Sequence, residues 1–300
     1  LEKYAALVGE KSSQQYTKEM EEYNCAYQHW LKSTEEVKQK DPQASWKEIH
    51  KICGECPWPQ PVGWQSPFRP NGLHETMIRR IAPYSLRGFL YYQGEEDVQR
   101  YADYSDMMLM LVKQWRMDWN DWNLPFLFVQ LPMYLADGEK NDSYWALQRE
   151  QQYIASMMIQ NAGMISLADC GEYDNIHPLD KKTPGEHLFQ LAKNLVYDKQ
   201  GTITATAAQL FSDNGKLYVT FDHLHEKLVM QTANGCPFEI SGEDNLFYPA
   251  KADVIHGNML CISNPAVKFP SAVKYAWYNF GEAVLFTESG NPVSPFFKSV

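Results

Sequence analysis

The sequence predicts an α/β fold, in which a parallel sheet is flanked by helices, followed by a C-terminal β module. Between residues 78 and 196, short apolar segments alternate with helical patterns, as in chains that build parallel sheets. Residues 125–131 form a continuous apolar run of the kind that is buried on both faces of such a sheet. After Gly201, short alternating strands are separated by turn signals such as Asp213-Asn-Gly215, which is typical of a small β-sandwich.

The first sixty residues are polar and rich in helix formers. A helix is expected from Glu10 to about Lys40, where Asp41-Pro42 ends it. Ser45 followed by Glu48 forms a capping box for a second, short helix. Prolines at 57, 59 and 61 then indicate an irregular connection.

We interpret residues 1–64 as a helical insertion or lid, 65–200 as the α/β part and 201–300 as the β-sandwich-like module. The α/β part is expected to contain strands at 86–92, 125–131 and 164–168, and helices at 98–117 and 143–160. A further helix is expected to open at Thr183-Pro184, with Thr183 as its cap and Glu186 three residues later. Because ligands bind beyond the carboxyl ends of parallel strands, the segments after residues 92 and 168 are the places to look for a site.

Composition excludes several classes of partner. The chain has 27 basic and 37 acidic residues and a formal net charge of -10, which argues against nucleic acid and anionic membranes as ligands. No stretch approaches the ~20 apolar residues needed to span a bilayer. His50, Cys53 and Cys56 lack an evident fourth zinc ligand, His74 being the nearest candidate, so a local disulfide or free thiols is the favoured interpretation. The sequence implies neither a metal nor an organic cofactor.

The first candidate catalytic motif is Asp174-Asn-Ile-His177, in the segment that follows the third predicted strand. A carboxylate three residues before a histidine can hold the imidazole in one tautomer and leave the other nitrogen free as a general base. Taken alone, the motif also fits a surface loop with an incidental histidine.

The second candidate motif is Gln93-Gly94-Glu95, at the end of the first predicted strand. A side-chain amide fixed beside a glycine can donate a hydrogen bond to a developing oxyanion. Taken alone, the motif fits an ordinary turn with an unpartnered glutamine better.

Together, the two motifs resemble the sialate O-acetylesterase and acetylxylan esterase branch of the SGNH hydrolases. The resemblance covers about three quarters of the chain and is most specific in the Tyr-Gln-Gly-Glu and Ile-His-Pro blocks. The matching segments are 69–73, 87–95, 114–116, 125–131, 148–150, 176–178, 238–244 and 294–296.

The resemblance implies a role for each matching residue. His177 corresponds to the family's catalytic base, Gln93 to its side-chain oxyanion donor, beside Gly94, and Glu95 to the acid that braces that loop. Asp174 fits the spacing of the acid that orients the histidine, although many members place it one residue closer, where this chain has Asn175. A second departure is Glu96-Asp97, where relatives usually have a small residue and an asparagine.

The family's nucleophile, the serine of a Gly-Gln-Ser-Asn block on its first strand, has no counterpart in the chain. Ser66 is a superficial match, but it follows no strand and precedes a proline, and no Gly-x-Ser-x-Gly elbow occurs. In a flavodoxin-like sheet of order 2-1-3-4-5, the three predicted strands would correspond to strands 3, 4 and 5. Without strand 1 beside it, the predicted strand at 86–92 would be an exposed apolar edge. We therefore expect an N-terminal segment or chain to complete the sheet, and this chain alone to be inactive.

The resemblance implies a serine esterase that removes O-acetyl groups from a sugar, with 9-O-acetylated sialic acid as the favoured substrate. It also implies an extracytoplasmic location (periplasmic, secreted or lysosomal). Two alternatives stay open. One is an acetylxylan-type esterase that acts on plant polysaccharide, and the other is a non-catalytic glycan-binding protein.

Overall fold

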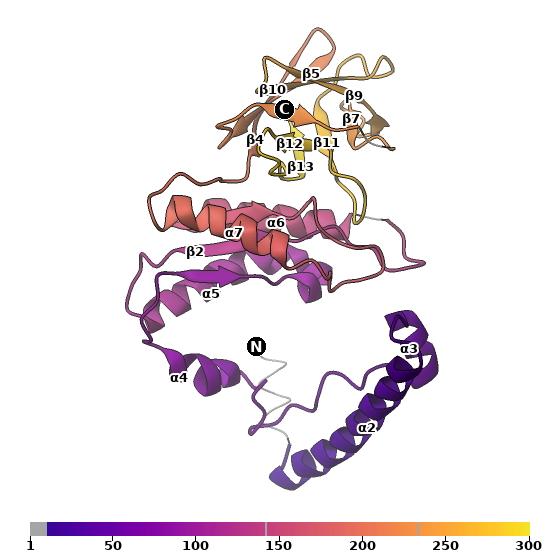
Figure 1. Ribbon diagram of the computed structural model, residues 1–300, viewed down its shortest axis with the longest axis vertical. Coiled ribbons are helices and arrows are strands. Elements are labelled where there is room, and N and C mark those ends of the chain that lie inside the picture. Colours follow the sequence, from indigo (N-terminus) through magenta and orange to yellow (C-terminus); the bar gives the residue numbers. More distant parts are fainter. Residues whose placement is uncertain (1–10, 142, 233) are drawn as a thin grey trace. The chain divides into compact units, whose positions relative to one another are not determined.

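The computed structural model describes residues 11–141, 143–232 and 234–300 (Figure 1). The chain divides into two compact units, with the boundary between Tyr84 and Ser85. The domain limits at 64 and 200 that the sequence suggested stay predictions.

The N-terminal unit contains two helices, α2 (Ser13–Lys40) and α3 (Trp46–Cys53). The predicted Glu10 lies outside the described residues, and helix α2 begins after Ser12, whose hydroxyl accepts from the N–H of Gln15. The capping box at the start of α3 is confirmed, because Ser45 and Glu48 bond each other's backbone N–H groups. A short π-helical turn (His74–Ile78) and α4 (Arg79–Ile81) end the unit.

The second unit begins with the predicted parallel sheet. Its strands are β1 (Phe89–Tyr91), β2 (Phe126–Gln130) and β3 (Ala162–Ser166), paired in the order β1-β2-β3. Both pairings are parallel, so all three strands end at the same edge. Strand β2 is buried along its whole length, as its apolar sequence predicts.

Helices cover both faces of this sheet (Figure 1). Met108 and Val112 of α5 (Tyr104–Asp118), with Ala155 of α6 (Tyr144–Met158), pack on one face. Leu188 and Leu191 of α7 (Lys182–Leu195) pack on the other. A 3₁₀ segment, η2 (Glu95–Asp103), leads from β1 into α5, so this helical stretch begins earlier than residue 98, where the sequence placed it.

Two local expectations are wrong in detail. Strand β3 ends at Ser166 and not at Ala168. Leu167 and Ala168 are buried in the core beyond the end of the strand, and their apolar side chains therefore resembled a continuation of it. Helix α7 begins at Lys182, one residue before the predicted cap Thr183. The carboxylate of Asp180 accepts from the N–H groups of Lys182 and Thr183 at 2.9 and 3.0 Å, and so takes the capping role.

The C-terminal strands form the predicted β module. They pair in antiparallel sheets of order β4-β5-β10-β9 and β13-β11-β7-β8, with a two-stranded sheet of β12 and β6, about one apolar core that includes Leu217, Ile240 and Tyr275. The strands are β4 (Thr206–Asp213), β5 (Lys216–Asp222), β6 (Leu228–Met230), β7 (Phe238–Ser241), β8 (Tyr248–Pro249), β9 (Lys251–Ile255), β10 (Met259–Ser263), β11 (Ala272–Tyr275), β12 (Leu285–Thr287) and β13 (Phe296–Ser299).

Buried hydrogen bonds join the module to the α/β part. The hydroxyl of Ser294 donates to Oε1 of Gln130 at the end of β2, at 3.0 Å. The side chain of Asn279 accepts from the N–H of Trp145 at the start of α6, also at 3.0 Å. These bonds fix the module beside the edge of the sheet where the strands end.

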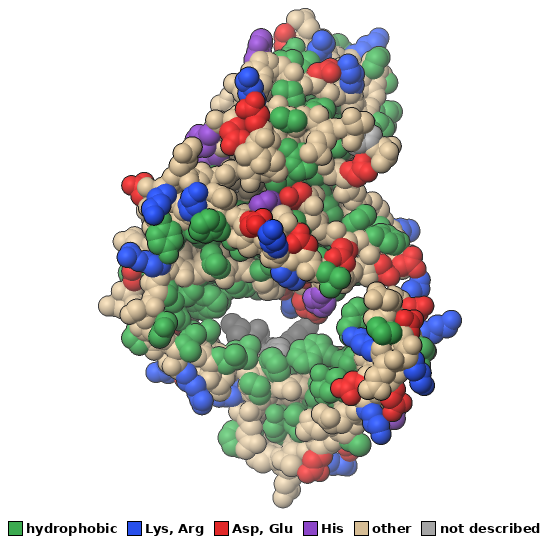
Figure 2. Space-filling model, viewed as in Figure 1, with side chains coloured by type: hydrophobic (Ala, Val, Ile, Leu, Met, Phe, Trp, Pro, Cys, Tyr) green, Lys and Arg blue, Asp and Glu red, His purple; other side chains and the backbone are tan. Residues whose placement is uncertain are grey.

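The surface carries both signs of charge. Acidic and basic side chains are interspersed over the face shown in Figure 2. Among the residues that the structure describes, each helix is too short or too polar to cross a bilayer.

Candidate active site

Gln93 and Gly94 form a turn after β1, and the second position of this turn requires glycine. Gly94 has φ 145°, a conformation that side chains with a Cβ rarely adopt. A Cβ added there would lie 3.0 Å from Nε2 of Gln152 and 3.1 Å from Nε2 of Gln148, both on α6. Helix α6 therefore packs directly against this turn.

The backbone of Gln93 is held from two sides. Its carbonyl oxygen accepts from the hydroxyl of Tyr104 at 3.0 Å and from Nε2 of Gln152 at 3.2 Å. Oε1 of Gln152 accepts in turn from the N–H of Leu131, just after β2, at 2.8 Å. One buried amide thus joins the segments that follow β1 and β2. Burial also raises the pKa of Tyr104, which keeps its hydroxyl a donor.

The side chain of Gln93 faces a carboxylate. Its Nε2 donates to Oδ2 of Asp97 at 2.7 Å, and its Oε1 lies 3.3 Å from the hydroxyl of Tyr91. Glu95 has no hydrogen bond or ion pair among the described residues, but its charge adds to the rise that burial causes in the pKa of Tyr92. The bracing role expected of Glu95 stays a prediction.

The segment that carries His177 runs from β3 to α7 and is anchored to the segment after β2. The N–H of Met133 donates to the carbonyl of Cys170 at 3.3 Å. Gly171 has φ 113°, and a Cβ there would lie 2.1 Å from the carbonyl oxygen of Met133, so the two backbones approach too closely for any other residue.

His177 itself is exposed, and its loop is held by the side chains around it. Its backbone N–H donates to Oδ1 of Asn175 at 3.1 Å, and Nδ2 of Asn175 donates to Glu172 at 2.6 Å. Glu172 also accepts from the N–H of Leu179 at 2.6 Å. The bond from Leu179, followed by that from Asn175, lowers the pKa of the Glu172 carboxyl. Asn175, at the alternative position for the acid, therefore holds the backbone of the histidine.

Asp174 does not contact the imidazole in this structure. It has a left-handed backbone, with φ 58°, and its N–H donates to the carbonyl of Leu135 at 2.9 Å. Its carboxylate accepts from the N–H of Asp137 at 2.8 Å. Among the described residues, no hydrogen bond joins it to His177. The orienting role of Asp174 stays a prediction.

A small buried cluster brings the Gln93 and His177 segments together. Val98 of η2, Leu131 after β2 and Trp145 of α6 form its centre. Tyr92, beside Gln93, and Ile176, beside His177, pack against this cluster. Residues adjacent to both motifs therefore pack against one apolar cluster at the carboxyl edge of the sheet.

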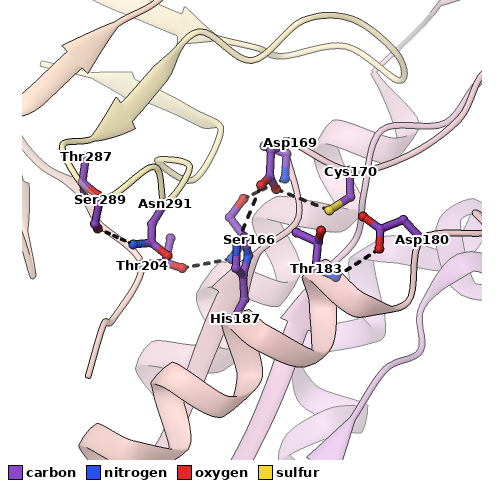
Figure 3. A network of polar contacts seen from close by, with 11 residues as sticks. Ser166, Asp169, Cys170, Asp180, Thr183, His187, Thr204, Thr287, Ser289 and Asn291 are labelled. Carbon is purple, nitrogen blue, oxygen red and sulfur yellow. Dashed lines mark hydrogen bonds and ion pairs between the residues drawn. The ribbon is translucent and has the colours of Figure 1, made fainter. Parts of the chain in front are cut away.

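A second polar group near this edge was not foreseen from the sequence (Figure 3). Oδ2 of Asp169 lies 3.8 Å from Nε2 of His187 on α7, and Oδ1 accepts from the thiol of Cys170 at 3.5 Å. Burial raises the pKa of Asp169, an effect that His187 partly offsets. This group links the start of the His177 segment to α7.

Sequence reasoning also missed the residues that position Gln93. Tyr104 and Gln152 are 11 and 59 residues away along the chain, and neither pairing has a local signature. The block that begins at Gln148 belonged to the resemblance but had no role attached to it. Gln148 lies on α6 next to Gly94, so its role is to pack against the turn that carries Gln93.

Other candidates from the sequence lie in the N-terminal unit. Ser66 is fully buried and its hydroxyl accepts from the N–H of Phe68, so it is not presented as a nucleophile. Cys53 and Cys56 are free thiols. Within the described ranges, no group of three or more His, Cys, Asp or Glu side chains is placed to hold a metal ion.

Comparison with known proteins addresses the resemblance directly. Residues 61–193 match the model of a carbohydrate esterase family, the sialic acid-specific acetylesterases. The chain is 26% identical to mouse sialate O-acetylesterase over 264 residues, which cover 78% of this chain and 48% of the mouse protein. It is 24% identical to the human sialate O-acetylesterase over 208 residues, or 63% of this chain and 39% of the human protein.

A solved structure agrees with these sequence relatives. The crystal structure of a carbohydrate acetylesterase from Xanthomonas citri superposes with a TM-score of 0.70 and 31% identity, covering 76% of this chain and 53% of that one. The chain spans about half the length, 48% and 46%, of the mouse and orangutan enzymes that it matches. These matches confirm the resemblance to the sialate O-acetylesterases and carbohydrate acetylesterases that the Gln93 and His177 motifs indicated.

Proposed function

We propose that this chain forms part of a serine esterase that removes O-acetyl groups from a sugar, with sialic acid as the substrate class. The observation that carries the proposal is the meeting of the Gln93 and His177 segments at one cluster, within the residues that match the acetylesterase family. The relatives are named sialate O-acetylesterases, which supports an esterase that acts on sugars. An extracytoplasmic location is part of the proposal.

In the proposed reaction, a serine hydroxyl attacks the acetyl carbonyl carbon while His177 takes its proton. The carbonyl oxygen becomes an oxyanion, which accepts from the side-chain amide of Gln93; such a donor is worth ~3 kcal/mol in the transition state. Collapse of the intermediate breaks the bond to the sugar oxygen, and His177 returns the proton to it. Water then hydrolyses the acetyl-serine with His177 again as base, and acetate leaves.

We further propose that the serine arrives on a strand outside residues 1–300 that pairs with β1. Within the described residues, β1 pairs only with β2 and its other edge is unpaired. Leu90 on this strand is 65% exposed, and it lies in a hollow shared with Leu127, Val196 and Tyr197. An apolar strand with an open edge is the surface to which another strand binds.

The test begins with the protein as cells make it. A tag at the C-terminal end of the chain, placed in the chromosomal gene, allows the native product to be isolated and its full mass measured. The product is then assayed for acetate release from 9-O-acetylated sialic acid and, in parallel, from acetylated xylan. Release from the sialic acid is expected. Release from xylan alone would move the substrate to plant polysaccharide, and release from neither would contradict the esterase.

A further inference from the structure

Asp97 is the one charged side chain bonded to the amide of Gln93 among the described residues. It lies in η2, four residues after Gln93, with 17% of its side chain exposed. Oδ2 accepts from Nε2 of Gln93 at 2.7 Å, and Oδ1 accepts from Arg100 at 3.0 Å. The distance to Gln93 is that of a well-formed N–H···O hydrogen bond.

The chemistry of these groups fixes which way the amide points. An ionised carboxylate can only accept, so the nitrogen end of the Gln93 amide must face Asp97. The oxygen end accepts from the hydroxyl of Tyr91 at 3.3 Å, while the proton of Tyr104 is directed to the backbone carbonyl of Gln93 at 3.0 Å. Burial raises the pKa of Tyr91 to about 12, which keeps its hydroxyl protonated at neutral pH. Reversal of the amide would place its oxygen against the Asp97 carboxylate, and both groups would then be acceptors.

The arrangement leaves one N–H of Gln93 available. A side-chain amide carries two N–H bonds, and Asp97 takes one of them. No second acceptor for Nε2 lies in the part of the chain that the structure describes. We infer that Asp97 is a positioning residue, which holds the Gln93 amide so that its remaining N–H is presented to the oxyanion. This inference rests on the proposed esterase function.

A purely structural role for Asp97 predicts a different outcome. Its other partner, Arg100, has 69% of its side chain exposed, and ion pairs of this kind contribute little to stability. Loss of that pair would leave turnover unchanged. Loss of the Gln93 orientation would instead lower kcat with little effect on KM, because the oxyanion exists only in the transition state.

The experiment compares three variants of the complete, cell-made enzyme. Asp97→Leu, which cannot accept, is expected to lower kcat by about 100-fold, the usual effect of removing one oxyanion donor. Asp97→Asn retains one acceptor oxygen but permits either orientation, so a smaller loss of about tenfold is expected. Glu96→Gln removes the same charge from an exposed neighbour and is expected to retain full activity.

A double-mutant cycle separates action through Gln93 from other effects. If Asp97 acts through that amide, Asp97→Leu combined with Gln93→Leu will be no slower than Gln93→Leu alone. Independent, multiplying losses would overturn the inference, as would normal kcat in Asp97→Leu. The proposed function is judged separately, by whether His177→Ala abolishes acetate release.

A second readout needs no activity. With glutamine selectively labelled with ¹⁵N, the side-chain amide protons of Gln93 can be assigned by their loss in Gln93→Leu. One proton is expected to be shifted downfield by its charge-assisted bond in the parent, and this shift is expected to vanish in Asp97→Leu. Identical amide signals in both proteins would overturn the positioning role even if the parent showed no esterase activity.

Discussion

The amide nitrogen of Gln152 lies 3.2 Å from the carbonyl oxygen of Gln93, and through this bond a fully buried residue of α6 holds the turn that carries the proposed oxyanion donor. The same side chain accepts from Leu131 at the end of β2. The position of Gln93 is therefore set by the packed helix layer and not by the turn alone.

Replacing Gln152 by leucine is expected to lower the free energy of unfolding. The substitution leaves the N–H of Leu131 unbonded in a buried place, at a cost of about 1–3 kcal/mol of unfolding free energy. Urea denaturation measures this cost, with Gln160→Leu, at an exposed glutamine just after α6, as the matched control. Equal stability of the two variants would show that the bonds of Gln152 are unimportant.

Gly94→Ala tests the turn itself. Its φ of 145° and the two amide nitrogens near its Cβ position predict a loss of about 1–3 kcal/mol, since strained backbone of this kind costs that much per residue. The turn would relax by moving Gln93, so kcat is expected to fall further than the stability change explains. Gly185→Ala, at a position where a Cβ meets open space, is the control. Wild-type kcat in Gly94→Ala would contradict this account of the turn.

The hydrogen-bonded carboxylate of Glu172 is expected to make the stability of the His177 loop depend on pH. Its pKa is lowered from 4.5 by the bonds from Leu179 and Asn175, so its contribution to stability is present above pH 4.5. That contribution is lost as the pH falls through the lower folded-state value. The protection factor of the Leu179 N–H, by which its exchange is slowed relative to an unstructured peptide at the same pH, should therefore fall as the pH drops through the lowered pKa of Glu172. In Glu172→Gln the protection factor at Leu179 should be low and should not change over this pH range. A high protection factor that does not change with pH in both proteins would count against the bond.

Leu90→Lys tests the open edge of the sheet. A charge on this exposed apolar strand is expected to prevent another strand from pairing with β1, without disturbing the core. If the completing strand is a separate polypeptide, native mass spectrometry of the Leu90→Lys product should show that this polypeptide has been lost. If the strand belongs to the same continuous chain, the variant should instead be cleaved more readily by proteases at β1. Phe269→Lys changes an 83% exposed residue of the β module and serves as control. Identical behaviour of the two variants would refute the docking surface.

The sequence identified elements whose signals are local and missed contacts between distant segments. Strand β2 is buried throughout, so its apolar run marked it clearly. Strand β3 was placed two residues late because Leu167 and Ala168 are buried without being part of the strand. The cap of α7 was assigned to Thr183 because its motif is common, yet the nearby carboxylate of Asp180 is a stronger acceptor.

The site shows the same limit. Gln93 and His177 were found because each sits in a recognisable block, and the structure brings the two blocks to one apolar cluster. The bonds that hold them come from Tyr104, Gln152 and Asp137, on other elements. The expected pair of Asp174 and His177 is not formed here, because the left-handed backbone of Asp174 directs its carboxylate to Asp137.

The most direct test of the central claim is acetate release by His177→Ala in the complete, cell-made protein, measured against the parent on 9-O-acetylated sialic acid. His225→Ala, at an exposed histidine of the β module, is the matched control. Loss of the general base predicts that release falls by at least about 1000-fold in His177→Ala and stays normal in the control. Near-parental release by His177→Ala would contradict the esterase mechanism proposed for this chain.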